Sequence, residues 1–478
     1  MRALRLLVLS FGLALAAAPA TAQISILGLK NSLVQFALEQ LSTPDQFEIS
    51  AGGVEEPEEG VTELVDVRIR DSQGVWFEAE GVAVSWSPRR ILVGELAIDS
   101  LVARGVRVLR PPAETPTPAE EEEDDAEAED DALFEWPRAP IATVIEEMRL
   151  DGVFLAPGVL TDSAVRLNAT GAARDEGDEQ AVRLEVTRID AVEGRIDLDY
   201  LRDFEAGTLR LDLDAREAAG GLVAGLLGLP EDAASQVSIS AEGPLSDWSV
   251  DFAAEAEQVL TVEGSGAIDL GPPFALTAEA VARPGPELSP EAQAALGEAA
   301  TLDIRASEGA DGVIDVETAR LTAPALELTA DGTFARETGA LDATLSLEAR
   351  AALAALVPGV DFERVAFDGT ASGALDDIEA EGELDLAGVE TGPVDLGSGA
   401  FGARIVYAPE RVRVALEGAA SGLRLDRLAP ETVGEATLAL DATLAGETLT
   451  LDALRLDSPL LALEASGALG AGAAGLDY

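Results

Sequence analysis

Apolar and polar residues alternate along most of this chain. From Val65 to Arg110, short runs place an aliphatic or aromatic residue at every second position, and glycines separate the runs. The same alternation returns from Ile141 to the end of the sequence, for example in Val182–Val186 and Leu209–Leu213. A period of two places alternate side chains on opposite faces of an extended strand. The pattern therefore predicts many β-strands joined by short turns.

A few segments change to helical spacing. Leu33, Phe36 and Leu41 lie near a period of 3.6, which predicts a helix over residues 23–45. Ser289-Pro290 has the form of a helix start, because serine caps the first turn and proline fits its first position. Residues 219–229 and 347–357 are predicted as two further short helices.

Turn residues recur in the strand-rich part. Three Asp-Gly pairs are predicted as hairpin turns, because an Asp-Gly pair accommodates positive φ: Asp151-Gly152, Asp331-Gly332 and Asp368-Gly369. The segments 243–248 and 373–378 resemble each other, and both lie between two predicted strands. The repeat length is not constant, so the sequence does not predict a strict solenoid.

Two segments differ from this pattern. Arg2 and Arg5 precede an apolar run that ends in the small residues of 20–22, so residues 1–22 are predicted to be a signal peptide or an N-terminal membrane anchor. Residues 114–138 are rich in proline, aspartate and glutamate and are predicted to be a disordered linker. We therefore expect an N-terminal β segment at 46–113 and an extended strand array at 139–478.

Charge and composition narrow the function. The 478 residues include 32 Lys and Arg against 89 Asp and Glu, a net charge of −57, yet 47% of the chain is hydrophobic. A disordered acidic chain has few apolar residues, so most of this chain is expected to fold with its acids outside. Nucleic acid is an unfavourable partner, because binding phosphates needs clustered cations.

Missing residue types exclude several chemistries. The sequence has no His and no Cys, which removes Ser-His-Asp and Cys-His catalysis, thiol redox chemistry and structural zinc. Lys30 is the sole lysine, and no phosphate-binding loop or dinucleotide fingerprint occurs. The sequence therefore indicates no cofactor and a protein that is not an enzyme. A hydrolase that uses only carboxylates stays open as an alternative.

The strongest chemical feature is the aliphatic face of the strands. It predicts either the closed core of a sandwich or barrel, or an open apolar trough wide enough for acyl chains. Alternation alone does not separate the two. If the trough is open, its predicted lining residues are Val182, Leu184, Val186, Ile196, Leu198, Leu209, Leu211, Leu213, Val412, Val414 and Leu416.

Two adjacent segments are similar to a known family. Residues 71–88, with Gly74-Val75-Trp76 and Trp86-Ser87-Pro88, and residues 94–111, with Leu109-Arg110-Pro111, resemble the N-terminal region of the TamB family of the translocation and assembly module. The similarity extends over about residues 45–270. Later turns are shared with the wider AsmA-like, bridge-like group.

The resemblance implies a fold and a function. It implies a mostly β protein with an elongated, twisted, open sheet groove and few short helices. It places this protein in the periplasm, either free or held at the inner membrane by its N-terminal segment. It further implies outer-membrane protein insertion and autotransporter secretion with a TamA-type barrel, unfolded outer-membrane proteins as clients, and phospholipid transport along the groove. We expect the strand array to end before the family's C-terminal domain. A β-rich surface or adhesive protein with a closed core is the alternative.

Overall fold

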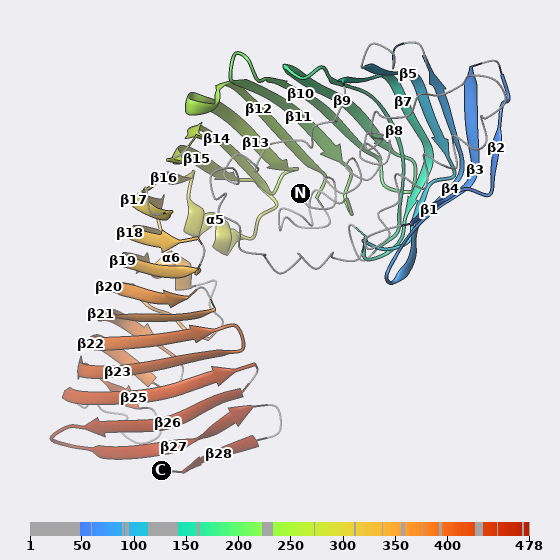
Figure 1. Cartoon of the computed structure of the whole chain (residues 1–478). Helices are drawn as coiled ribbons and strands as arrows, with labels where there is room; N and C mark the ends of the chain where they lie inside the picture. The colour runs from blue at the N-terminus through green and yellow to red at the C-terminus, as the bar shows by residue number, and fades with distance from the viewer. Residues whose placement is uncertain are drawn as a thin grey trace, which may run out of the picture. The chain divides into compact units, whose positions relative to one another are not determined.

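The computed structural model is mostly β and is organised in two compact units (Figure 1). Unit 1 is Met1–Glu257 and unit 2 is Gln258–Tyr478, and each is described by itself. The predictions for residues 1–22, 23–45 and 114–138 lie outside the described residues. The structure describes residues 48–58, 60–87, 90, 95–112, 142–159, 163–221, 233–271, 273–309, 312–336, 338–354, 359–374, 376–391, 394–425, 434–446, 448–470 and 473–477.

Unit 1 is a sheet in which neighbouring strands are mostly antiparallel. β1 and β2 both pair with β3, β5 and β6 both pair with β4 and β7, and β7 to β13 follow in chain order. The strands are β1 (Glu48–Ser50), β2 (Gly53–Glu55), β3 (Val61–Asp71), β4 (Gly74–Trp86), β5 (Glu95–Arg104), β6 (Arg107–Val108), β7 (Ala142–Leu155), β8 (Val165–Asp175), β9 (Glu179–Arg188), β10 (Gly194–Asp203), β11 (Thr208–Glu217), β12 (Ser235–Pro244) and β13 (Trp248–Ala256), with the 3-10 turn η2 (Leu245–Asp247) before β13.

One pairing in unit 1 is parallel. β5 and β6 both run parallel to β7, with Leu101 beside Met148 and Val108 beside Leu155. Parallel neighbours need a long crossover connection, and residues 109–141 connect these strands. The acidic segment therefore joins two strands of the same sheet. The predicted segment 46–113 and the first part of the predicted segment 139–478, up to Glu257, both lie in unit 1.

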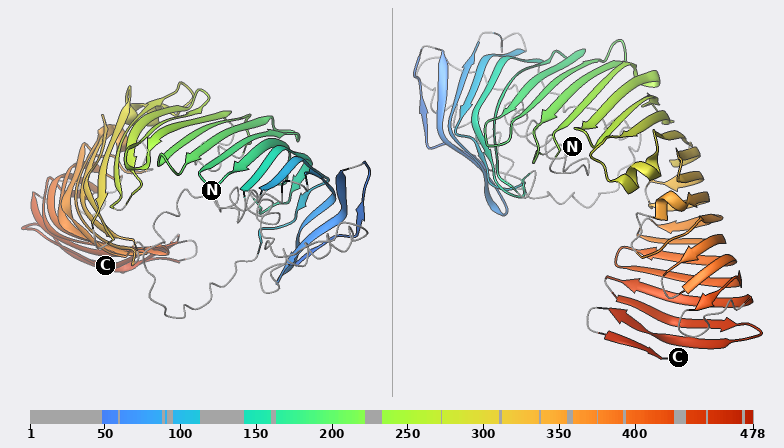
Figure 2. Two further views of the ribbon diagram at one scale, coloured as in Figure 1. Left: turned by 45° about the horizontal axis from the view of Figure 1, so that its top comes forward. Right: turned by 180° about the vertical axis from the view of Figure 1, so that it is seen from behind.

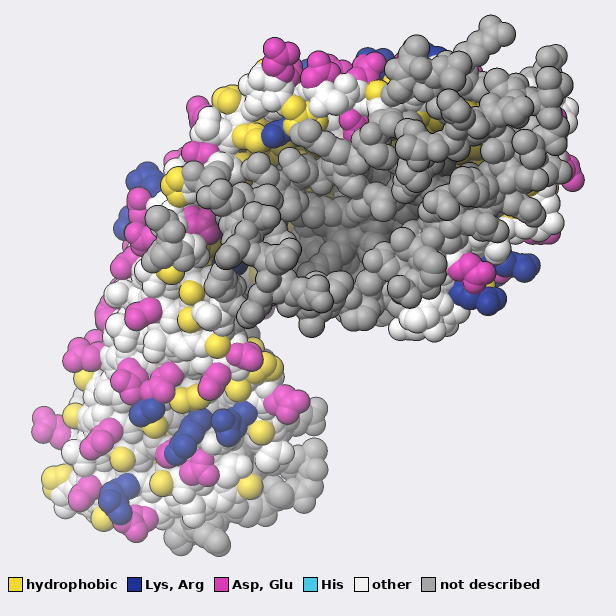
Figure 3. All heavy atoms as spheres, in the orientation of Figure 1, with side chains coloured by type: hydrophobic (Ala, Val, Ile, Leu, Met, Phe, Trp, Pro, Cys, Tyr) yellow, Lys and Arg dark blue, Asp and Glu magenta, His cyan; other side chains and the backbone are white. Residues whose placement is uncertain are grey.

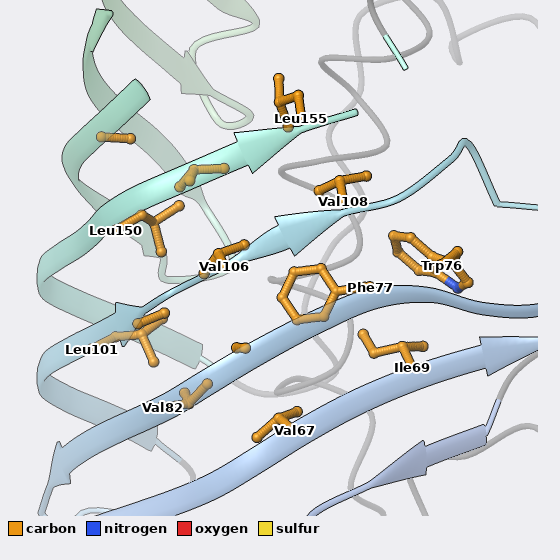
Figure 4. Packing of buried hydrophobic residues seen from close by; sticks show 14 of the residues in the cluster. Val67, Ile69, Trp76, Phe77, Val82, Leu101, Val106, Val108, Leu150 and Leu155 are labelled. Atoms are coloured by element: carbon orange, nitrogen blue, oxygen red, sulfur yellow. The ribbon is translucent and has the colours of Figure 1, made fainter. Parts of the chain in front are cut away.

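A large cluster of buried hydrophobic residues lies on β3 to β9 in unit 1 (Figure 4). Ile98, Leu101 and Leu155 are each 1% exposed, and Val153 is fully buried. Trp76 and Phe77 add an edge-to-face ring pair at 5.8 Å. Apolar burial of this kind is the main stabilising contribution to a β-sheet face.

We expect Leu101→Ala to destabilise unit 1 by about 2–5 kcal/mol, because it removes a buried aliphatic group and leaves a cavity. The control is Ile189→Ala, since Ile189 is 47% exposed and its loss should cost well under 1 kcal/mol. Urea unfolding measures both. Equal losses would contradict the placement of Leu101 in the core.

The strands of unit 2 are also antiparallel to their neighbours. Its strands pair in chain order from β14 to β23 and from β25 to β28, β23 pairs with β25, and β24 pairs with β22. The strands are β14 (Leu260–Asp269), β15 (Ala275–Pro284), β16 (Ala300–Glu308), β17 (Val313–Ala323), β18 (Leu326–Ala335), β19 (Ala340–Arg350), β20 (Arg364–Ala374), β21 (Asp377–Glu390), β22 (Val394–Ala408), β23 (Arg411–Ser421), β24 (Arg424–Leu425), β25 (Glu435–Ala445), β26 (Thr448–Asp457), β27 (Ala462–Gly470) and β28 (Ala473–Asp477).

Two short helices lie at one end of the strands of unit 2. α5 (Pro290–Leu296) begins as predicted: the Ser289 side chain accepts a hydrogen bond from the Ala292 N–H at 3.2 Å. The predicted helix over 347–357 is wrong at its start. β19 continues to Arg350 because Leu347 and Ala349 remain in the strand ladder, and among the described residues of this range the helix is α6 (Ala351–Ala354). The prediction for 219–229 falls largely outside the described residues.

The three Asp-Gly predictions are also wrong. Asp151-Gly152 lies inside β7, where Gly152 has a φ of 68° at a register shift between Leu150 and Val153. Asp331-Gly332 lies inside β18 and Asp368-Gly369 inside β20. At Gly332 and Gly369 an added Cβ would lie 2.2 and 2.3 Å from a carbonyl oxygen of the neighbouring strand, so these glycines permit close strand contact. The similar segments at 243–248 and 373–378 do connect strands, and Gly243 and Gly373 share positive φ values of 134° and 124°.

The strand ladder of each unit is open rather than closed into a barrel. Among the described residues, no pairing joins the first strand of a unit to its last. At about 4.8 Å per strand, the ladder from β14 to β28 extends over roughly 60 Å. Both views of Figure 2 show the strands of each unit side by side in a twisted array. The predicted mostly β fold, with elongated, twisted, open sheets and few short helices, is confirmed.

Candidate functional site

One face of the unit 2 sheet is apolar throughout its central strands. In the rows that cross Ile378–Leu386 of β21, the strand register places only Gly, Ala, Val, Leu, Ile, Phe and Tyr on this face from β18 to β25. We call it the apolar face of unit 2. Its widest rows across the sheet are Leu328, Leu347, Phe367, Leu384 and Phe401, and Leu341, Gly373, Ile378, Tyr407, Val412 and Leu444.

This face stays partly open to solvent. Leu302, Tyr407 and Leu444 are 36%, 45% and 45% exposed, although all three lie on the apolar side of their strands. Many of their neighbours, including Leu416 and Leu440, are half-buried. Soluble proteins seldom leave a long apolar patch in water, and such patches commonly bind an apolar partner.

The opposite face of the same strands carries the charge. Figure 3 shows Asp, Glu and Arg side chains intermixed over β20 to β27. Arg413 contacts Asp441 at 2.6 Å, and Arg404 contacts Glu379 at 2.6 Å. These pairs are exposed, so each contributes little to stability. The charged side chains keep this face of the sheet hydrated, whereas the other face carries apolar side chains.

The structure places every predicted lining residue on an apolar face. In unit 2, Val412, Val414 and Leu416 are consecutive apolar-face positions of β23. In unit 1, three adjacent strands bring the remaining eight together on what we call the apolar face of unit 1. These are Val182, Leu184 and Val186 of β9, Ile196 and Leu198 of β10, and Leu209, Leu211 and Leu213 of β11.

The two apolar faces differ in burial. Leu184 and Leu209 are only 7% and 2% exposed, whereas Leu211 and Leu213 are half-buried. Leu184, Val186 and Leu198 also pack with the unit 1 core. The apolar face of unit 1 is therefore partly closed, and the more open surface lies in unit 2.

A buried ionic cluster lies at one end of the apolar face of unit 1. The Arg188 guanidinium contacts Glu217 at 2.5 Å and Asp190 at 3.0 Å, and the Arg188 and Glu217 side chains are 9% and 5% exposed. Asp190 also accepts hydrogen bonds from the backbone N–H of Arg166 and Val192 at 3.1 and 3.0 Å. The cluster ties β8, β9 and β11 together with two carboxylates against one cation.

These bonds predict loss of stability in acid. Burial alone raises the pKa of the Asp190 carboxyl, but the hydrogen bonds from Arg188, Arg166 and Val192 outweigh it and hold the pKa below its ordinary value. A lowered folded-state pKa stabilises the fold above the unfolded-state pKa of about 3.9, and that stability is lost as the pH falls through the folded value.

We therefore expect Asp190→Asn to be less stable than the wild type at neutral pH, with a difference that shrinks below about pH 4. Urea unfolding of both proteins at a series of pH values measures this difference. A difference independent of pH would show that the Asp190 charge does not contribute.

A second arginine lies on the same face at the opposite end of the strands. Arg202 of β10 pairs in register with Gln180 of β9 and Leu209 of β11. Its guanidinium lies over the Phe204 ring at 5.3 Å, and its Nε is buried with no hydrogen-bond partner. Unlike Arg188, Arg202 forms no ion pair with any residue of the described part of the chain.

The sequence analysis missed both arginines, although a signal for them was present. The even-numbered positions are apolar from Val182 to Val186 in β9 and from Ile196 to Tyr200 in β10, and Arg188 and Arg202 continue the same alternation. A cation at an inward position of a strand is costly to bury unless a partner compensates it. The alternation of apolar and polar residues does not show which acidic residue, if any, lies beside each arginine in the fold.

The described ranges contain neither a membrane-spanning helix nor a metal-binding cluster. No helix there has the length and apolarity needed to cross a membrane. Within the same ranges, no group of three or more acidic side chains is arranged to hold a metal ion.

Comparison with known proteins identifies no relative. No protein-family model matches the chain, and neither the curated proteins nor the solved structures give a match.

Proposed function

We propose that this protein is a TamB-like cell-envelope protein that holds phospholipid acyl chains on its apolar sheet faces and conducts lipid between the inner and outer membranes. In this proposal it acts in the periplasm, and it aids outer-membrane protein insertion and autotransporter secretion together with a TamA-type barrel. The segments 71–88 and 94–111 support the family assignment by resemblance.

The observation that carries the lipid part is the apolar face of unit 2. It is apolar from β18 to β25, and Tyr407 and Leu444 on it remain 45% exposed. An acyl chain laid on such a surface gains about 0.8 kcal/mol per buried methylene. Because neighbouring rows are chemically alike, a chain can move from row to row without a deep binding well.

The alternative is a β-rich surface or adhesive protein with a closed core. The cluster of fully buried residues in unit 1, among them Ile98, Leu101 and Val153, favours it, because a closed core needs no ligand. The half-exposed face of unit 2 favours the lipid proposal over this one.

The experiment is purification of the full chain in mild detergent, followed by solvent extraction and mass spectrometry of the bound material. We expect phospholipid in at least equimolar amount. A folded protein free of lipid, whose thermal unfolding does not change when phospholipid is added, would overturn the proposal. Protease accessibility on intact cells would then test the surface-protein alternative.

A further inference from the structure

We propose that Arg202 is the phosphate-binding residue of a glycerophospholipid site at one end of the apolar face of unit 1. This inference rests on the proposed function, because it assumes that acyl chains occupy that face. It adds to the proposed function the residue that binds the lipid headgroup, the end of the strands at which the headgroup lies, and the direction in which the acyl chain runs.

Arg202 has what an amphipathic anion requires. Along β10 it follows Tyr200 and Leu198 on the same face. Tyr200 is 5% exposed, so the acyl chain of a lipid bound to the guanidinium would lie over the half-buried residues of this face, Leu198, Leu211 and Leu213.

Two nearby acids, Asp203 and Glu179, lie on the opposite face. Asp175 lies on the same face two strands away, but it accepts a hydrogen bond from the Gln180 side chain at 3.4 Å and forms no ion pair with Arg202 among the described residues. Arginine is well suited to phosphate, because its planar donors bind two oxygens at once.

The opposite end of the same strands disfavours an anion. Arg188 lies about 26 Å away, at about 3.3 Å per residue along β9. Its guanidinium is already engaged by Asp190 and Glu217. The cluster has one more carboxylate than cation, so it repels phosphate. The two ends therefore fix one orientation, with the phosphate at Arg202 and the chain running toward Arg188.

The buried Nε of Arg202 is consistent with a ligand-dependent role. The guanidinium lies over the Phe204 ring at 5.3 Å, and its buried Nε has no hydrogen-bond partner among the described residues. A buried donor without an acceptor is costly, and a phosphate oxygen is a strong acceptor for it.

The test compares phosphatidic acid with diacylglycerol carrying the same pyrene-labelled acyl chains, because the two differ only in the phosphate. We expect the full-length wild type to bind phosphatidic acid at least about tenfold more tightly, the size of one charge-assisted hydrogen bond. Arg202→Gln should reduce this preference to less than about twofold while diacylglycerol still binds, and Arg202→Lys should keep part of it.

The matched control is Arg183→Gln on the opposite face of β9, where the Arg183 side chain is 77% exposed and pairs with Asp199. It removes the same charge and should retain the preference. An equal loss in Arg183→Gln, an unchanged preference in Arg202→Gln, or displacement of the lipid by millimolar inorganic phosphate would each overturn the inference. If the wild type binds phosphatidic acid and diacylglycerol equally tightly, this inference alone fails. If it binds neither lipid, the proposed function fails with it.

Discussion

Leu416→Arg is expected to lower the affinity of the protein for a pyrene-labelled acyl chain by at least tenfold while the strand content stays near that of the wild type. Leu416 lies on the apolar face of unit 2 between Ala403 and Leu440 in register. A guanidinium there forces the chain either to desolvate a charge or to leave the row. Loss of contact with about two methylenes corresponds to about 1.6 kcal/mol, which is more than tenfold.

The control for this variant is the adjacent position on the other face. Ala415→Arg inserts the same charge into β23, but Ala415 pairs in register with Arg404 and Asp441 on the charged face. Acyl-chain affinity should not change in Ala415→Arg. Far-UV circular dichroism shows whether each variant folds. Equal losses in the two variants, or no loss in either, would contradict an acyl-binding role for the apolar face of unit 2.

The second large effect is expected from Arg188→Met, which should destabilise unit 1 by about 3–5 kcal/mol. The substitution keeps an aliphatic side chain of similar length and removes the charge. It leaves the Glu217 carboxylate, whose side chain is 5% exposed, without the cation that it contacts at 2.5 Å. Removing one partner of a buried ion pair is costly because the other charge stays buried without compensation.

Two further variants separate this effect from simple loss of packing. Arg183→Met in the same strand removes an exposed pair with Asp199 and should cost at most about 1 kcal/mol. Adding Glu217→Gln to Arg188→Met should recover part of the loss, because the more buried of the two carboxylates that faced Arg188 no longer carries a charge. Urea unfolding measures all three proteins. If the double variant is as unstable as Arg188→Met, the ionic explanation is wrong.

The sequence predicted the strand content and the identity of the apolar residues because both follow from local chemistry. In an alternating strand such as Leu209–Leu213, the pleat alone decides that every second side chain shares a face. All the predicted lining residues accordingly lie on apolar faces. The helix start at Ser289-Pro290 was equally local, since the cap and the first turn lie within four residues.

The failures came from interactions with other strands. Asp331-Gly332 and Asp368-Gly369 have the local form of a turn, but both glycines lie in strand interiors where the adjacent backbone comes too close for a side chain. Leu347 and Ala349 have helical neighbours in sequence, yet the ladder with β20 keeps them in β19. In both cases, the free energy of pairing with a neighbouring strand outweighs the local preference.

The alternation by itself determined a chain of amphipathic strands with aliphatic and acidic faces. Only the tertiary structure decided how open each face is: Leu209 is 2% exposed in unit 1, whereas Leu444 is 45% exposed in unit 2. It also decided that β5 and β7 are parallel across the acidic segment, and that Arg188 has two carboxylate partners while Arg202 forms no ion pair with any described residue. The physical reason is that pleat geometry is set within one strand, whereas burial and charge compensation depend on residues distant in sequence.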